Sequence, residues 1–187
     1  TTRQAAAAVG ADGSVVGLDV SADMVAAAAS IPRADGAAPI EWVVADGDAG
    51  PPPVDPVDVV LSRFGVMFFA DATRAFGHLA AAARPGGRLA IATWALRDET
   101  EMFSLPLQEA VAVLTEDGIE VPPLPPDGGP FSLGTPDVLA AVLGGAGWVD
   151  VDVVGHALAL PLGGGLPPAE AAVSSMSLGP AQRLTAD

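Results

Sequence analysis

A short apolar run that ends in an acid constrains the fold of this chain more than any other stretch. Val15–Asp19 has the composition of a buried β-strand, and Ser21, two residues later, is a typical N-cap of a following helix. A carboxylate at the tip of a parallel strand, beside a helix start, is placed to accept hydrogen bonds from both hydroxyls of a nucleoside ribose. Asp19 is therefore the first candidate ligand-binding residue.

Strands and helices alternate along the first half of the chain. The apolar periodicity predicts strands at residues 14–19, 40–45, 57–61 and 88–94, and helices at residues 1–9, 21–30 and 71–83. Alternation at these intervals favours βαβ units, and therefore an α/β fold with an open, mostly parallel, Rossmann-like sheet and helices on both faces. The strands should be parallel, with Asp19, Asp46 and Ser62 at one edge of the sheet.

The second half is less regular. Helices are predicted at residues 101–114 and 135–143, a Pro/Gly-rich loop at 121–130, and a late, bent strand at 148–160. Residues 161–187 form a tail without a convincing final strand. No internal repeat is visible.

Charge and composition exclude several classes of partner. The 187 residues include 23 acidic and 8 basic side chains, for a net charge of −15. Such a surface repels phosphate backbones and anionic membranes, so we expect neither nucleic acid nor a membrane as a partner. The chain has no cysteine for a disulfide or a thiolate metal site, and no apolar run approaches the roughly 18 residues of a spanning helix. These features predict a cytoplasmic protein without a metal centre.

Three predicted strand ends carry groups that suit a ligand, and ligands of open α/β sheets bind outside the carboxyl ends of the strands. These ends are Asp19, Asp46-Gly47-Asp48 and Ser62-Arg63-Phe64. An acid of the second end can accept a hydrogen bond from an adenine amine, and Met24 offers a polarizable side chain to an adenine face. Each has a structural alternative: a helix cap for Asp19, a turn for residues 46–48, and core packing for Met24.

Four segments carry a family resemblance when taken together. They are Val-Gly-Leu-Asp-Val-Ser-Ala-Asp-Met at 16–24, Val-Val-Ala-Asp-Gly-Asp-Ala at 43–49, Val-Asp-Val-Val-Leu-Ser-Arg-Phe-Gly-Val-Met-Phe-Phe at 57–69 and Arg-Pro-Gly-Gly-Arg-Leu at 84–89. With them the chain resembles class I S-adenosylmethionine-dependent methyltransferases, and is similar to the methyltransferase type 11 group related to ubiquinone/menaquinone-biosynthesis C-methyltransferases. The resemblance is strong to about Trp94 and traceable to about Gly179.

The resemblance implies S-adenosyl-L-methionine as the cofactor and a small molecule as the methyl acceptor. It implies Asp19 on the ribose, Met24 against the adenine, Asp46 near the adenine amine with Asp48 as the alternative acid, and Ser62 and Arg63 beside the methionine moiety. Val20 and Gly47 complete the implied cofactor contacts. The acceptor would lie beneath a cover built from residues 95–133, with Phe103 and Phe131 as apolar contacts that could equally be core.

The chain also departs from the family pattern. The family's first strand and glycine-rich loop have no counterpart in this sequence, and Thr1 and Thr2 match family positions just beyond them. A closing C-terminal strand of the family also has no clear counterpart. We therefore expect residues 1–187 to be a single partial methyltransferase domain, clipped at both ends and inactive by itself. Its parts would be a cofactor-binding core at 1–94, a substrate cover at 95–134, and a C-terminal helix, late strand and tail at 135–187.

Two other functions remain open from the sequence. A nicotinamide-dependent Rossmann oxidoreductase also uses an acid after its second strand, although it does not need the acids at 46–48. A non-catalytic, methyltransferase-like binding module is the other. No catalytic residue is identified, because methyl transfer from a sulfonium to a good nucleophile requires mainly positioning and desolvation. The two histidines, His78 and His156, are expected to be solvated and structural, respectively, and the oligomeric state is not indicated.

Overall fold

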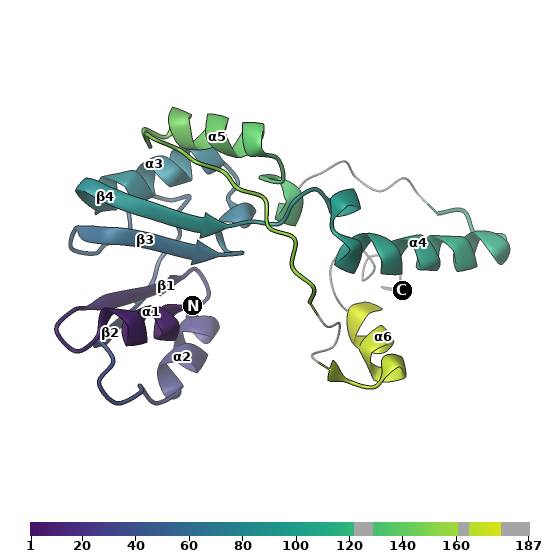
Figure 1. The fold of residues 1–187 in the computed structure, drawn as a ribbon, viewed down its shortest axis with the longest axis horizontal. Coiled ribbons are helices and arrows are strands. Elements are labelled where there is room, and N and C mark those ends of the chain that lie inside the picture. The colour runs from purple at the N-terminus through teal and green to yellow at the C-terminus, as the bar shows by residue number, and fades with distance from the viewer. Residues whose placement is uncertain (122–128, 161–164, 177–187) are drawn as a thin grey trace. The chain divides into compact units, whose positions relative to one another are not determined.

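The structure, a computed structural model, describes residues 1–121, 129–160 and 165–176 (Figure 1). These residues belong to two compact units. The first unit contains residues 1–92 and 140–151, and the second contains residues 93–139 and the described residues after 151. Each unit is described by itself below.

The first unit alternates helices and strands. Its elements are α1 (Thr2–Val9), β1 (Val15–Asp19), α2 (Ala22–Ser30), β2 (Ile40–Val44), β3 (Val57–Arg63), the 3-10 turn η1 (Val66–Phe68), α3 (Ala72–Ala82) and β4 (Ala83–Ala92). Side-chain caps fix where two helices begin. The Ser21 hydroxyl accepts from the Met24 N–H at 3.3 Å, and the Asp71 carboxylate accepts from the Arg74 N–H at 3.0 Å.

The strands form two parallel pairs. In the first pair, β1 and β2 run in register from Val15 opposite Ile40 to Asp19 opposite Val44. In the second pair, β3 and β4 run from Val59 opposite Arg88 to Arg63 opposite Ala92. Parallel pairing with intervening helices confirms the Rossmann-like α/β fold predicted from the sequence. The expected single sheet is instead two two-stranded sheets, because no strand of the described residues lies hydrogen-bonded between the pairs.

Helix α1 and the loop before β2 build a small alanine core beneath the first pair. Ala6, Ala37 and Ala38 are buried, and Val15 and Ile40 pack against them. The Ala38 N–H donates to the Ala6 carbonyl at 2.8 Å, which anchors the loop to the helix. Small side chains allow this close approach of helix and loop, and Val15 of β1 and Ile40 of β2 pack on the resulting core.

Arg3 joins α1 to the end of α2. Its guanidinium donates to the carbonyls of Pro32 at 3.0 Å and Ile31 at 2.5 Å, and also to the carbonyl of Ala28. The same guanidinium lies 5.9 Å from the centre of the Trp42 ring. The last carbonyls of a helix and those just after it lack intrahelical donors, and one planar cation here reaches the carbonyls of Ala28 in α2, of its C-cap Ile31 and of Pro32 beyond it.

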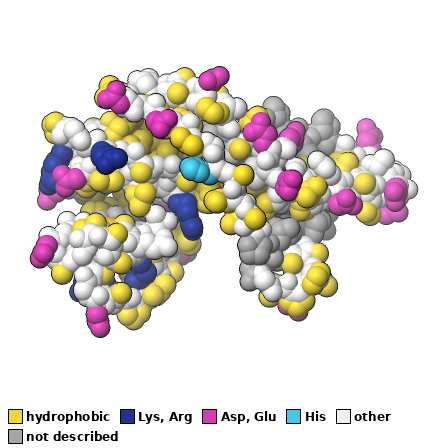
Figure 2. Space-filling model, in the orientation of Figure 1, with side chains coloured by type: hydrophobic (Ala, Val, Ile, Leu, Met, Phe, Trp, Pro, Cys, Tyr) yellow, Lys and Arg dark blue, Asp and Glu magenta, His cyan; other side chains and the backbone are white. Residues whose placement is uncertain are grey.

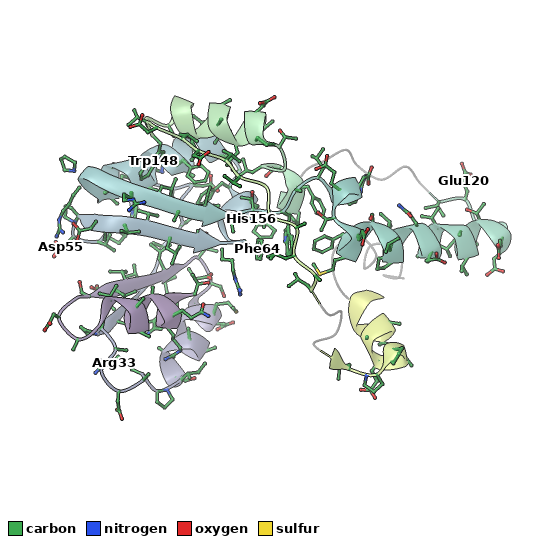
Figure 3. The ribbon with its side chains drawn as sticks, viewed as in Figure 1. Arg33, Asp55, Phe64, Glu120, Trp148 and His156 are labelled. Atoms are coloured by element: carbon green, nitrogen blue, oxygen red, sulfur yellow. The ribbon has the colours of Figure 1, made fainter. Side chains whose placement is uncertain are left out.

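The second pair packs on a larger core. Met67 and Phe76 are the largest fully buried side chains, and the Phe69 ring meets the Phe76 ring edge-on with centroids 5.7 Å apart. Helix α5 (Pro136–Gly145) contributes to this unit from Ala140 onward. Trp148, labelled in Figure 3, donates its indole N–H to the Phe76 carbonyl at 3.2 Å. This bond ties the chain after α5 to α3.

The second unit is helical in the described residues. It contains the 3-10 turn η2 (Arg97–Glu99), α4 (Glu101–Glu116), η3 (Gly129–Phe131), the first residues of α5, and α6 (Pro168–Met176). Trp94, Phe103 and Phe131 form an aromatic cluster with centroid distances of 5.2 and 5.3 Å. Helix α6 was not expected from the sequence, although Pro168 at its first position and Glu170 in its first turn are ordinary helix-start signals.

Two predicted strands differ from the structure. Residues 148–160 form no strand, and their apolar side chains are exposed, Val149 at 81% and Leu158 at 75%, because no strand of the described residues pairs with them. Strand β4 begins at Ala83 rather than at residue 88. Its pairing is interrupted between Val57 and Val59, where Gly86 takes a positive φ of 79°. Most of the loop predicted at 121–130 lies outside the described residues.

Arginines and acidic side chains are distributed differently on the visible face. In Figure 2 the acidic side chains are scattered over the whole face, whereas the arginines lie over the first unit.

In the described part of the chain, no helix combines the length and the apolar character that crossing a membrane requires.

Candidate functional site

The carboxyl ends of β1 and β2 bring two predicted residues to the same place. Asp19 is the last residue of β1 and stands opposite Val44, the last residue of β2. The Ala45 N–H donates to the Asp19 carbonyl at 3.1 Å, which continues the pairing one residue further. Asp46 follows directly. Because the two strands are parallel, Asp19 and Asp46 leave the sheet at one edge, as the sequence predicts.

Asp19 uses only part of its hydrogen-bonding capacity. Its Oδ1 accepts from the Ser21 N–H at 2.9 Å, which accounts for the helix-start alternative. The other oxygen, Oδ2, accepts no hydrogen bond from the residues that the structure describes. A carboxylate can accept about four hydrogen bonds, so Asp19 has capacity for two hydroxyl donors.

A cavity of about 240 Å³ opens beside Asp19. It is lined by α1, α2 and the strand pair through Thr1, Thr2, Arg3, Leu18, Asp19, Met24, Val25, Ala28, Ile31 and Trp42. Met24 is 61% exposed, so the core-packing alternative for this side chain is wrong. Val20 is exposed next to Asp19. The volume lies below the roughly 300–1,000 Å³ of whole-ligand pockets, so the cavity suits one part of a ligand.

The two acids after β2 have different surroundings. The Asp48 carboxylate accepts from the N–H groups of Ala70 at 3.0 Å and Asp71 at 3.1 Å, and so fixes the segment before α3. Asp46 is exposed, and among the residues that the structure describes its carboxylate accepts one hydrogen bond, at Oδ1 from the Asp48 N–H at 2.9 Å. Asp48 therefore has a structural role, and Asp46 is the acid with a carboxylate oxygen available to a ligand.

The same contacts shift the titration of Asp48. The backbone hydrogen bonds from Ala70, and then from Asp71, hold the pKa of Asp48 below its ordinary value of 3.8. Burial of the carboxylate raises its pKa and so opposes these bonds, whereas the electrostatic effects of Arg74 and His78 add to the lowering. The ionised carboxylate is thus the form that the fold stabilises.

Replacing Asp48 with asparagine should lower stability at neutral pH by about 0.5–1.5 kcal/mol, the net contribution of a hydrogen bond. Because the folded pKa lies below the unfolded one, this contribution is complete above the ordinary pKa and disappears as pH falls through the folded value. Urea unfolding at pH 7 and pH 3 checks this, with exposed Asp12→Asn as the matched control. A variant whose loss is the same at both pH values would contradict the assignment.

The end of β3 carries Ser62, Arg63 and a strained residue. Ser62 is half-buried, and its Oγ lies 3.2 Å from where a Cβ on Gly65 would be. The Arg63 guanidinium is exposed and lies 5.8 Å from the centre of the Phe64 ring. Phe64, labelled in Figure 3, has a φ of 61°, a left-handed conformation that is unfavourable for an aromatic residue. Such strain is concentrated at functional sites, which makes this turn a candidate part of the site.

The two predicted acceptor contacts lie in the aromatic cluster of the second unit. Phe131 is 5% exposed, and its ring packs edge-on against Phe103, which is half-buried. Phe131 therefore has a core position within its unit. Contact of either ring with a methyl acceptor stays a prediction, as does the substrate cover at residues 95–134.

The structure revises the interpretation of both histidines. His78 is half-buried rather than solvated, and its Nδ1 lies 2.8 Å from the Gly47 carbonyl oxygen. His156 is exposed in a segment that forms no strand. Within residues 1–121, 129–160 and 165–176, no group of three or more His, Asp or Glu side chains is arranged to hold a metal ion. The contact of His78 joins residues 31 positions apart, so no local sequence pattern indicates it.

Comparison with protein families gives one finding for the first unit. Residues 1–87 match the family described as Methyltransferase domain. The matched segment includes every predicted cofactor contact, from Asp19 to Arg63. A comparison with curated proteins finds no match. The family match and the parallel α/β architecture together identify a class I methyltransferase fold, and they support S-adenosylmethionine-dependent methyl transfer in general.

Proposed function

We propose that this chain is part of a methyltransferase domain that, when complete, transfers a methyl group from S-adenosylmethionine to a small-molecule acceptor. The observation that carries the proposal is the cavity at the carboxyl end of β1, which Asp19 and Met24 line together. It lies within the segment that matches the methyltransferase domain family. The resemblance of residues 16–24, 43–49, 57–69 and 84–89, taken together, to ubiquinone/menaquinone-biosynthesis C-methyltransferases is the basis for proposing a small organic acceptor.

The residues of the site fit the nucleoside part of the cofactor. Oδ2 of Asp19 accepts no hydrogen bond from the described residues and suits ribose hydroxyls, and the exposed side chain of Met24 suits an adenine face. Oδ2 of Asp46, which likewise accepts none from the described residues, suits the adenine amine. Val20 and Gly47 contribute backbone beside these side chains.

Ser62 and Arg63 are proposed to bind the methionine part. The exposed guanidinium of Arg63 suits a carboxylate, because planar N–H donors match its two oxygens. The Ser62 hydroxyl can donate one bond or accept from an ammonium group. When bound, S-adenosylmethionine supplies a methyl group on an electrophilic sulfonium, and the protein contributes positioning and exclusion of water.

The net charge of the chain limits the class of methyl acceptor that it can bind. With 23 acidic and 8 basic residues, the protein repels polyanions, so nucleic acid is not the proposed acceptor. No general base is assigned, since an acceptor that is already nucleophilic needs none.

Direct titration of the intact protein with S-adenosylmethionine and with NAD tests the proposal. We expect S-adenosylmethionine to bind at least about tenfold more tightly. Both ligands share the adenosine contacts, but the net charge of −15 repels the anionic pyrophosphate of NAD, whereas Arg63 can pair with the methionine carboxylate. Tighter binding of NAD would favour an oxidoreductase. Binding of neither nucleotide would favour a non-catalytic module, and either result would overturn the proposal.

A further inference from the structure

His78 contacts the loop that carries the two acids. It lies in α3, and its Nδ1 is 2.8 Å from the carbonyl oxygen of Gly47. A carbonyl oxygen can only accept a hydrogen bond, so Nδ1 carries the proton and donates it. The bond joins the middle of α3 to the loop after β2.

The peptide unit that His78 holds is also the one that holds Asp46. The carbonyl of Gly47 and the N–H of Asp48 belong to one planar peptide group. His78 donates to that carbonyl, and that N–H donates to Oδ1 of Asp46 at 2.9 Å. In a trans peptide the two groups point in opposite directions, so fixing the carbonyl fixes the direction of the N–H. The two hydrogen bonds also polarise each other through the peptide.

Other contacts hold the turn that contains this peptide unit, and the Ala49 N–H closes it by donating to the Asp46 carbonyl at 3.1 Å. Asp48 anchors the far side of the loop through its carboxylate, on the N–H groups of Ala70 and Asp71. Phe69 packs against Gly47 so closely that a Cβ there would lie 2.8 Å from its ring. These contacts hold the turn as a whole, whereas the His78 bond acts directly on the carbonyl of its central peptide, Gly47–Asp48.

We propose that His78 is a positioning residue of the cofactor site, which orients the Asp46 carboxylate toward the adenine amine through the Gly47–Asp48 peptide. The role rests on the proposed function, because Asp46 is the residue through which His78 acts. It makes His78 a determinant of base specificity rather than of overall affinity. A purely structural histidine would instead affect every ligand of the site equally.

The ligand test compares an adenine with a base that lacks the amine. S-Adenosylhomocysteine and S-inosylhomocysteine are titrated calorimetrically into the intact protein and its His78→Ala, His78→Asn and His78→Gln variants. The amide nitrogen of Asn occupies the place of Nδ1, whereas that of Gln occupies the place of Nε2. We expect Ala and Gln to weaken adenosyl binding by about 3- to 10-fold and to leave inosyl binding within about twofold, with Asn close to the unsubstituted protein. His156→Ala is the matched control.

A second measurement follows the peptide itself without any ligand. Hydrogen exchange of the Asp48 amide should accelerate in the Ala and Gln variants and stay slow in the Asn variant, because that N–H is the one bonded to Asp46. Equal losses for both ligands, or an unchanged Asp48 amide, would overturn the inference. If the unsubstituted protein binds neither ligand, both the proposed function and the role of His78 in ligand binding fail. Exchange of the Asp48 amide still tests the link from His78 through the peptide, because that measurement needs no ligand. The two failures can therefore be distinguished.

Discussion

Asp19→Ala is expected to weaken binding of S-adenosylmethionine by about 1.5–3 kcal/mol, which corresponds to roughly a 10- to 150-fold higher Kd. Within the described part of the chain the carboxylate accepts one hydrogen bond, from the Ser21 N–H, and it lines the cavity beside Met24. Both ribose hydroxyls would donate to a charged acceptor there, and hydrogen bonds to charged groups are the stronger kind. Calorimetric titration of the intact protein measures the effect.

Asp19→Asn separates binding from folding. The amide keeps an oxygen for the Ser21 N–H but removes the charge, so the start of α2 is retained while affinity falls. His156→Ala is the control, since its exposed side chain lies in the second unit. A control with the same loss of affinity as Asp19→Ala would remove the ribose assignment.

Gly17→Ala should destabilise the first unit by about 1–3 kcal/mol. Gly17 stands opposite Trp42 in the strand pair, and a Cβ on it would lie 2.4 Å from Cζ3 of that ring and 3.0 Å from the Thr2 methyl group. The Arg3 guanidinium lies 5.9 Å from the centre of the same ring, so a shift of the ring would also alter this cation–π contact. For a chain of this size the midpoint of thermal unfolding should fall by about 2–4 °C per kcal/mol.

Urea unfolding followed by circular dichroism checks this result. Gly50→Ala is the matched control, because nothing lies within 4 Å of a Cβ at that position. Combining Gly17→Ala with Trp42→Leu should recover part of the loss, since the smaller side chain makes room for the methyl group. If Gly17→Ala is as stable as Gly50→Ala, then the strand pair is not packed as described.

The local sequence pattern was sufficient to predict the strands and helices whose formation depends on neighbouring residues. The run Val15–Asp19 and the cap at Ser21 predicted β1 and the start of α2, because strand composition and helix capping act within a few residues. The same reasoning failed at residues 148–160. Their loose alternation of apolar residues suits a strand, but a strand forms only where another strand offers its edge.

Contacts between residues that are distant in the sequence determine which predicted site residues are available to a ligand. The choice between Asp46 and Asp48 depends on the N–H groups of Ala70 and Asp71, more than 20 positions away. The contact of His78 with Gly47 is of the same kind. Spacing along the chain predicted which strand ends carry acids, and the three-dimensional packing before α3 determined which acid is available.

The positions of the tryptophans allow ligand binding to be followed by intrinsic fluorescence. The chain has three tryptophans and no tyrosine, so its intrinsic fluorescence comes from indole alone. Trp42 borders the cavity with Asp19, whereas Trp94 belongs to the aromatic cluster of the second unit and Trp148 is bonded to Phe76. Replacing Trp94 and Trp148 with phenylalanine therefore leaves Trp42, which borders the proposed nucleoside site, as the single fluorescent tryptophan. A change in its emission would report ligand binding without an attached dye.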